Sequence, residues 1–325
     1  MKKKIIVILI ISIILLLLFL FIFNFLNASK NNSQKTANPD FTENITVLDD
    51  FTKKDETNVQ SDTKYRKNAF NILLCGIDEG RSDKYWGRSD SMMIISVNKE
   101  YETIRIASLS RAVYVDIKGY KSGRLSSAYS YGGPNLLVET IESNYKIEID
   151  KFVCINFDTF RKIIDLFGGV ELYLSSEEAE AVAKTLKNNG IYESTFKNNG
   201  NGVYDLDGYS ALEYSRLRYI DTDRERTARQ RKVVEKLYYK VYNLTASQKL
   251  KMIKDISPLL VTDFTNAQIF SQFNKLSGTN YKIEQTVIPN KSSDLQLVDS
   301  TEVLFVDWNE TIEYANSFFY SPPEK

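Results

Sequence analysis

The most apolar stretch of the chain is residues 5–23, where Ser12 is the single polar residue. A helix needs roughly 20 such residues to cross the hydrocarbon core of a bilayer. Three lysines precede the stretch and mostly Asn and Ser follow it, so the positive-inside rule places the N-terminus in the cytoplasm. We predict a cytoplasmic tail at 1–4, an uncleaved transmembrane anchor at 5–28 and an extracytoplasmic remainder. A cleaved signal would leave that compartment unchanged.

The segment after the anchor, residues 29–65, is polar and has neither a helical nor a strand period. This composition is typical of a flexible linker. Residues 66–325 are long enough for one sizeable core, and the 43% hydrophobic and 12% aromatic content of the chain is ordinary for a globular domain. We therefore predict one folded extracytoplasmic domain over residues 66–325.

Three segments have the pattern of adjoining β-strands, residues 71–78, 91–98 and 103–111. The loop between the first two is too short for a crossover helix, so an antiparallel pair is favoured. Asp78 leaves the first strand and Asp90 enters the second. The pairing would therefore bring both carboxylates, together with Arg88, to one end of the sheet.

The rest of the pattern predicts helices over 135–145 and 158–167, a strand over 170–174, a mobile polar helix-and-loop segment over 175–203, helices over 208–218 and 224–244, and a last helix before a closing strand. Asp158 and Asp207 are expected to cap helix N-termini, and Gly168 is expected to end a helix. Thr262 or Asp263 is expected to cap the last helix. Helices packed on a sheet are the predicted architecture.

The composition restricts the chemistry. Lys+Arg and Asp+Glu each total 42, and histidine is absent, which removes the commonest general base, the Ser/His/Asp arrangement and every His-based metal site. Cys75 and Cys154 lie in apolar strand-like runs, so we expect buried structural thiols. Catalysis would then depend on carboxylates, arginines and a hard cation. An extracytoplasmic position argues against a nucleic-acid partner.

Six arginines lie shortly before and within the helix predicted to begin at Arg224. At about 100° per residue, Arg226, Arg229 and Gln230 extend the apolar stripe of that helix. Arg224 and Arg231 fall nearly opposite, and we expect both in solvent. A buried arginine is costly unless it meets an anion, so the first group needs a partner.

Arg216 and Arg218 would point to one side if the chain is extended there. Two interpretations of the arginines stay open. In one they form internal ion pairs with nearby acids, namely Glu213, Asp221, Asp223 and Glu225. In the other they clamp a phosphate or diphosphate beside a Mg²⁺ ion held by Asp78 and Asp90, an arrangement suited to phosphoryl transfer.

Eight motifs resemble, in the same order, those of the LytR-CpsA-Psr family of bacterial cell-envelope proteins. They are GID (76–78), GRSDSMMI (87–94), SLSRAVYV (108–115), SAYSYGGP (127–134), LFGGVEL (166–172), LDGYSALEYSRLR (206–218), ERTARQR (225–231) and LLVTD (259–263). The resemblance covers nearly all of the extracytoplasmic region. It implies a three-layer α-β-α fold around a central mixed sheet, with an apolar pocket that receives a polyprenyl chain.

By this resemblance the protein is expected to be a phosphotransferase. It would move an anionic glycopolymer (teichoic acid, teichuronic acid or capsular polysaccharide) from a polyprenyl-diphosphate carrier to peptidoglycan, with Mg²⁺, or alternatively Mn²⁺, as cofactor. The expected location is the cell membrane, spanned by a single N-terminal helix. Two alternatives stay open: a pyrophosphatase acting on the same lipid, and a non-catalytic lipid-binding, wall-polymer-binding or regulatory protein.

The resemblance also implies residue roles. Asp78 and Asp90 match the family's Mg²⁺-associated pair, and Arg111 matches its essential arginine, so these three are the expected catalytic residues. The residues expected to bind the substrate diphosphate are Arg88, Arg111, Arg124, Arg216, Arg218, Arg226 and Gln230. Arg124 stands where the family usually has lysine.

The chain departs from the family beside the essential arginine, where Ser110 and Ala112 replace a proline and an aspartate. The lost carboxylate implies a weaker orientation of Arg111 or an altered cation site. One apolar helix stripe could line the lipid pocket, although such a stripe is more often plain core. Its members are Phe157, Phe160, Ile163 and Phe167.

Overall fold

The computed structural model describes residues 68–78, 87–276, 279–291 and 294–323. All of them belong to one structural unit, Val59–Lys325. The predicted tail, anchor and linker at 1–65 lie outside the described residues. Within the described part of the chain, no helix combines the length and the apolar character needed to cross a membrane.

A six-stranded sheet forms the centre of the fold, with strand order β10-β3-β2-β1-β6-β9. Its strands are β1 (Ala69–Ile77), β2 (Ser89–Asn98), β3 (Thr103–Leu109), β6 (Lys151–Ile155), β9 (Val261–Thr262) and β10 (Lys282–Ile288). β2 is antiparallel to both β1 and β3, whereas β6 is parallel to β1 and β10 is parallel to β3. The predicted hairpin and the mixed sheet are thus confirmed.

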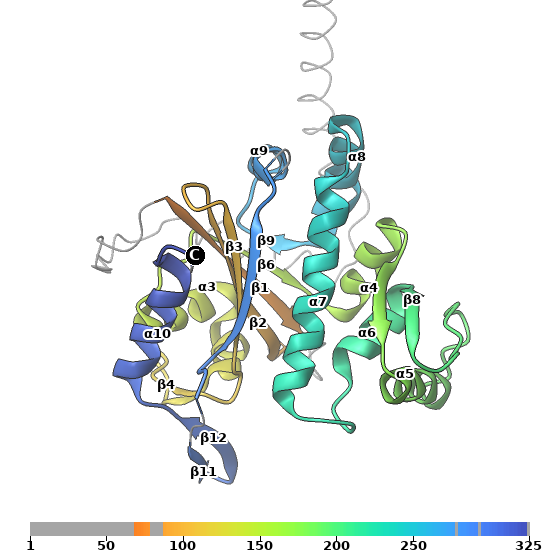
Figure 1. The fold of residues 1–325 in the computed structure, drawn as a ribbon. Coiled ribbons are helices and arrows are strands. Elements are labelled where there is room, and N and C mark those ends of the chain that lie inside the picture. The colour runs from red at the N-terminus through yellow and green to blue at the C-terminus, as the bar shows by residue number, and fades with distance from the viewer. Residues whose placement is uncertain (1–67, 79–86, 277–278, 292–293, 324–325) are drawn as a thin grey trace, which may run out of the picture. The chain divides into compact units, whose positions relative to one another are not determined.

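Helices cover both faces of this sheet (Figure 1). The helices of the described chain are α3 (Leu125–Tyr145), α4 (Phe157–Leu166), α5 (Ser176–Asn188), α6 (Gly208–Arg216), α7 (Asp223–Tyr242), α8 (Ala246–Ile256), a 3₁₀ turn (Ser257–Leu259), α9 (Asn266–Leu276) and α10 (Trp308–Tyr320). Side chains of α3 and α10 share a core with one face of the sheet. α4, α7, α8 and α9 approach the other face. Three layers result.

Alternating side chains explain why both faces can be covered. On β1, Leu73 and Cys75 enter the core beneath α3 and α10, whereas Ile72 faces the opposite layer. Cys75 is the register partner of Cys154 on β6. Both thiols are buried and unbridged, as predicted.

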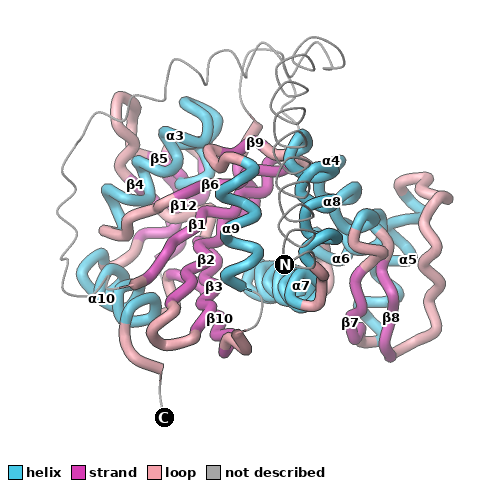
Figure 2. The backbone as a smooth tube through the Cα atoms, turned by 90° about the horizontal axis from the view of Figure 1, so that it is seen from above, coloured by secondary structure: helices cyan, strands magenta, loops and turns pink. Residues whose placement is uncertain are grey.

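Three two-stranded sheets lie outside the central one. They are β4 (Tyr114–Val115) with β5 (Gly123–Arg124), β7 (Val170–Leu174) with β8 (Gly202–Leu206), and β11 (Asp294–Val298) with β12 (Thr301–Phe305). The strand predicted at 170–174 therefore exists, but it pairs with β8 beside α5 (Figure 2). Neither α8, α10 nor the β11–β12 pair was predicted.

The helix predicted at 135–145 is the second part of α3. The helix begins at Leu125 and is interrupted at Gly132 and Gly133, where φ is 65° at Gly133. The first part buries Leu125, Ala128 and Tyr129 at i, i+3 and i+4. It was missed because the segment before the two glycines is short and rich in serine, which disfavours helix interiors.

Helix caps follow the sequence in part. Asp207 caps α6, as predicted, by accepting a hydrogen bond from the Ser210 amide, and Gly168 lies just past α4 with φ 70°. The prediction for Asp158 was wrong, because Asn156 caps α4. That for α9 was wrong too, because its first-turn amide, on Gln268, is held by Thr265 Oγ1 at 3.3 Å.

Candidate active site

Asp78 and Asp90 lie at the same end of the sheet. Ile77 and Ser89 are register partners at the end of the β1–β2 hairpin. Asp78 follows Ile77 directly, and its amide donates to the Arg88 carbonyl at 3.0 Å. Its carboxylate accepts a 2.5 Å hydrogen bond from the Arg88 amide. The expected meeting of two carboxylates and Arg88 at one sheet end is therefore present.

The Gly87 backbone packs closely against the Asp78 backbone at the end of the hairpin. A Cβ built on Gly87 would lie 1.8 Å from the Asp78 carbonyl oxygen. The Asp78 carbonyl belongs to the backbone, so it cannot move away from such a Cβ as the end of a flexible side chain could. We expect Gly87→Ala to lower the free energy of unfolding by about 1–3 kcal/mol, the usual cost of overpacking. Urea unfolding measures this, with Gly202→Ala, which meets nothing within 4 Å, as the matched control. Equal stability of the two variants would contradict the crowding.

Asp90 is the centre of an arginine cluster drawn from three elements. Arg111, just after β3, donates to Oδ1 at 2.7 Å, and Arg218, just after α6, donates to Oδ2 at 3.2 Å. Arg226, in the first turn of α7, donates to the Asp90 carbonyl at 3.4 Å. Three arginines from the ends of β3, α6 and α7 therefore converge on one residue.

The charges of this cluster alter its acid–base behaviour. Burial alone would raise the pKa of Asp90, but Arg111, Arg218 and Arg226 outweigh it and hold the pKa below its usual 3.8. Burial also lowers the pKa of Arg226 to about 10, against the pull of Asp223. Asp90 and Arg226 are therefore both charged at neutral pH.

Because the pKa of Asp90 is lower in the folded chain than in the unfolded chain, its stabilisation is present above pH 3.8 and is lost as the pH falls through the folded-state value. We expect Asp90→Asn to lower the free energy of unfolding most near neutral pH. The difference from wild type should shrink as the pH drops below 3.8. Urea unfolding across a pH series measures it, and a pH-independent difference would refute the linkage.

Asp223 supplies a second carboxylate to the cluster. As the first residue of α7, it lies 2.8 Å from Arg226 and 3.8 Å from Arg111. Ala112 leaves no acid next to Arg111 in the chain, and Asp223 reaches that arginine from another element. Three arginines thus share the carboxylates of Asp90 and Asp223, which leaves one excess positive charge for an anionic ligand.

Gln230 fixes the position of α7 against its neighbours. Its Oε1 accepts from Ser91 Oγ at 2.9 Å, and its Nε2 donates to the Ser215 carbonyl at 3.1 Å. The amide therefore ties α7 to β2 and α6. In this structure it positions the arginines around Asp90.

Two of the expected diphosphate ligands have other partners. Arg216, the last residue of α6, pairs with Glu213 at 3.5 Å and lies over the Phe157 ring at 4.4 Å. Arg124 donates through Nε to the Glu302 carbonyl at 2.5 Å. Neither contacts Asp90. Among the described residues, the arginines that donate to Asp90 are Arg111, Arg218 and Arg226.

The other arginines of α7 differ in burial and in partners, and one of them departs from the prediction. Arg229 is buried and pairs with Asp221, as the ion-pair interpretation required. Arg224 is exposed, as expected. The prediction for Arg231 was wrong, since it is 7% exposed and donates to Ser108 of β3 at 2.7 Å. That face of α7 meets the end of β3 instead of solvent.

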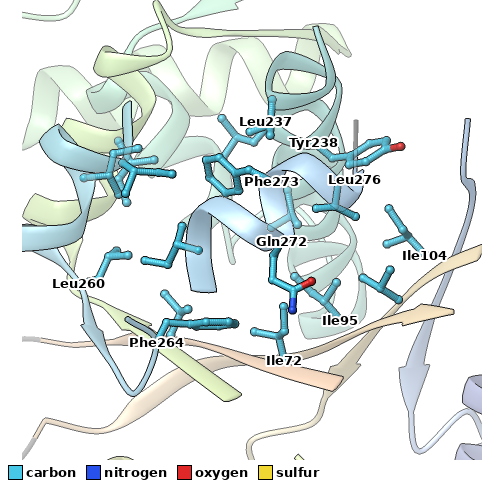
Figure 3. Close-up of a pocket in the computed structure, with 18 of the residues that line it drawn as sticks. Ile72, Ile95, Ile104, Leu237, Tyr238, Leu260, Phe264, Gln272, Phe273 and Leu276 are labelled. Carbon is cyan, nitrogen blue, oxygen red and sulfur yellow. The ribbon is translucent and has the colours of Figure 1, made fainter. Parts of the chain in front are cut away.

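An apolar cavity of about 300 Å³ lies between the sheet and the helices α4, α7, α8 and α9. Figure 3 shows Ile72, Ile95 and Ile104 of the sheet facing Leu237 of α7 and Phe273 of α9 across it. Of the candidate lipid-lining stripe on α4, Ile163 and the following Phe167 line the cavity, whereas Phe157 and Phe160 do not.

One helix connects the cavity to the arginine cluster. Arg226 contacts Asp90, and Val234, Leu237 and Val241 of the same helix line the cavity. Eight residues separate Arg226 from Val234, which corresponds to about 12 Å along the helix axis. A cationic site and an apolar site are thus adjacent.

Comparison with known proteins identifies the family of this chain. A profile of the LytR_cpsA_psr family matches residues 28–316. The chain belongs to this family. It is 33% identical over 222 residues to the polyisoprenyl-teichoic acid–peptidoglycan teichoic acid transferase TagU of Enterococcus faecalis, covering 66% of each chain. It is 29% identical to biofilm regulatory protein A of Streptococcus mutans, covering 69% of this chain and 52% of the relative. The chain thus spans about half to two thirds of these curated relatives.

A solved structure shares the fold. The LytR-CPS2A-psr family protein YwtF (TagT) with bound octaprenyl pyrophosphate lipid superposes with a TM-score of 0.58, at 21% identity, over 78% of this chain and 91% of that one. The α/β fold with a mixed central sheet expected from the motifs is thereby confirmed.

Proposed function

We propose that this protein is a membrane-anchored phosphotransferase that moves an anionic glycopolymer from a polyprenyl-diphosphate carrier to peptidoglycan. The observation that carries the proposal is α7, which presents Arg226 to a cationic cluster and Val234 to an apolar cavity. A diphosphate attached to a long hydrocarbon would place its negative charge at the cationic cluster and its hydrocarbon in the apolar cavity. The name of the E. faecalis relative and the octaprenyl pyrophosphate bound to TagT support this ligand class.

The reaction needs charge neutralisation at the diphosphate. A hydroxyl of the peptidoglycan acceptor attacks the sugar-linked phosphorus, a new O–P bond forms, and the bond from that phosphorus to the bridging oxygen breaks. Polyprenyl phosphate leaves with the bonding electrons, and the hydroxyl proton is released. Arg111, Arg218 and Arg226 would stabilise the charge that develops on the phosphoryl oxygens.

The donor set fits a magnesium ion. Mg²⁺ is usually bound through one or two carboxylates together with substrate phosphates, and among the described residues no group of three or more His, Cys, Asp or Glu could hold a metal. Asp78 and Asp90 would supply two carboxylates, since an oxygen that accepts one hydrogen bond keeps a further lone pair. Bound there, Mg²⁺ would neutralise phosphate charge.

We place the catalytic domain outside the cell membrane. The apolar run at 5–23 and the three lysines before it support a single-pass anchor with a cytoplasmic N-terminus. Such an anchor would hold the cavity within reach of a lipid substrate that cannot leave the bilayer.

The test uses the full chain in detergent with Mg²⁺, a polyprenyl-diphosphate glycan and peptidoglycan. We expect polyprenyl phosphate to be released only when the acceptor is present. Release without acceptor would instead indicate a pyrophosphatase, and lipid binding without turnover would indicate a binding or regulatory protein. A thermal-shift titration with polyprenyl diphosphate isolates binding, because a ligand of the native state raises apparent stability.

A further inference from the structure

Two arginines of α7 lack the acidic partners that the others have. Among the described arginines, Arg124, Arg224 and Arg231 alone have no carboxylate oxygen within 4.0 Å. Arg224 and Arg231 share one face of α7, two turns apart. That face is distinct from the one on which Arg226 contacts Asp90 and Gln230 contacts Ser91.

Arg231 is a buried charge with neutral partners. It is 7% exposed, and its Nη1 donates to Ser108 Oγ at 2.7 Å and to Thr227 Oγ1 at 3.3 Å. Its Nε has no hydrogen-bond partner. A buried guanidinium normally requires an anion to offset its desolvation, and the described residues supply none here.

Arg224 adds a second positive charge at the same place. It is exposed, and its Nη1 donates to the Asn290 carbonyl, just after β10, at 3.3 Å. Its neighbours do not neutralise it, because Asp223 pairs with Arg226 and Glu225 accepts from Thr222. Burial lowers the pKa of Arg231 to about 10, and repulsion by Arg224 adds to that effect. Two like charges therefore lie on one face of α7, and no carboxylate oxygen of the described residues lies within 4.0 Å of either.

This face adjoins the arginine cluster on the other side of the β3 end. Ser108, which holds Arg231, is three residues before Arg111, and the Ser110 amide bonds the Ile288 carbonyl at the end of β10 at 2.9 Å. An anion here would lie beside a diphosphate held by Arg111 without sharing its ligands.

We propose that Arg224 and Arg231 form a second anion subsite that takes a phosphate of the glycopolymer beyond the diphosphate. Arg224 makes the contact at the surface, and Arg231 supplies the buried charge behind it. The assignment rests on the proposed function for the identity of its ligand, whereas the anion site itself stands on the unpaired charges. It would favour polymers with phosphate in their repeating units over neutral glycans.

The first test measures anion binding by calorimetry, with the full chain in detergent. We expect protein saturated with inorganic pyrophosphate to bind inorganic phosphate as well. Arg224→Gln and Arg231→Gln should each weaken that second binding by about tenfold, as for a lost charge-assisted hydrogen bond. Arg218→Gln should weaken pyrophosphate instead, and Arg161→Gln serves as the control. Because Arg224 is exposed, its variant keeps the test valid if Arg231→Gln fails to fold.

Absence of phosphate binding to the saturated protein, or unchanged binding in the Arg224 and Arg231 variants, would overturn the subsite. A second arm compares transfer from lipids bearing a bare disaccharide and the same disaccharide with glycerol phosphate units. We expect the variants to lose about tenfold more kcat/KM on the phosphate-bearing lipid. Equal losses on both lipids would assign these arginines a structural role. If wild type transfers neither lipid but still binds phosphate, the proposed function fails and the anion site stands.

Discussion

Replacing Arg111 with methionine is expected to lower the rate of glycopolymer transfer by about 10²–10³-fold, the usual effect of removing one donor to a developing negative charge. Arg111 makes the 2.7 Å contact to Asp90 and also reaches Asp223, so its loss removes a cation and loosens both carboxylates. The hydrocarbon cavity is untouched. The measurement is acceptor-dependent release of polyprenyl phosphate, with lipid binding followed in parallel.

Arg161→Met is the matched control for this substitution. The Arg161 side chain is 28% exposed and pairs with Asp158 at 2.8 Å, closely comparable to Arg111, which is 27% exposed and pairs at 2.7 Å. Both variants thus lose a half-buried ion pair of similar length, and Arg111→Met also loses the longer contact to Asp223. If Arg161→Met slows transfer as much as Arg111→Met, the loss reflects general destabilisation and the catalytic assignment is wrong.

Filling the apolar cavity is expected to separate lipid affinity from diphosphate affinity. Val234→Trp places a large ring in the cavity of about 300 Å³. Each buried CH₂ contributes about 0.8 kcal/mol, so excluding two or three of them would weaken polyprenyl diphosphate binding by roughly 15- to 60-fold. The affinity for inorganic pyrophosphate should not change, since Arg218 and Arg226 stay in place.

The same substitution at Val203, which is 65% exposed on β8 and does not line the cavity, serves as the control for Val234→Trp. Calorimetric titrations of both ligands give the comparison. If both variants bind the lipid equally well, or if Val234→Trp weakens pyrophosphate to the same extent as lipid, the hydrocarbon chain does not occupy this cavity.

The end of the β1–β2 hairpin shows how much of the site can be predicted from the local sequence pattern. Two strand-length apolar runs joined by a short loop allow little except antiparallel pairing, and this alone brought Asp78, Arg88 and Asp90 together. The motif resemblance added Arg111, Arg218 and Arg226, which do meet at Asp90. Asp223 was named only as an ion-pair partner, because its dual contact depends on where α7 begins relative to β3.

Arg216 and Arg231 are two residues whose surroundings the sequence pattern predicted wrongly. Arg216 lies two residues from Arg218, yet it is still within α6 and turns to Glu213 and Phe157. Arg231 lies opposite the apolar stripe of α7, and this position predicted that its side chain would be exposed to solvent. The end of β3 covers that face through Ser108 instead. A helical wheel describes the helix alone, whereas burial depends on every element that packs around it.

The sequence by itself determined the strand hairpin, the α7 stripe, the family motifs and the absence of histidine chemistry, because these depend on residue identity and on near neighbours along the chain. Only the tertiary structure decided which arginines share Asp90, which ones have other partners, and which two of the four in α7 have no carboxylate of the described residues within 4.0 Å. Several of those outcomes depend on contacts between segments more than 100 residues apart, such as Arg231 with Ser108 and Arg226 with Asp90, separated by 123 and 136 positions. No local periodicity contains that information.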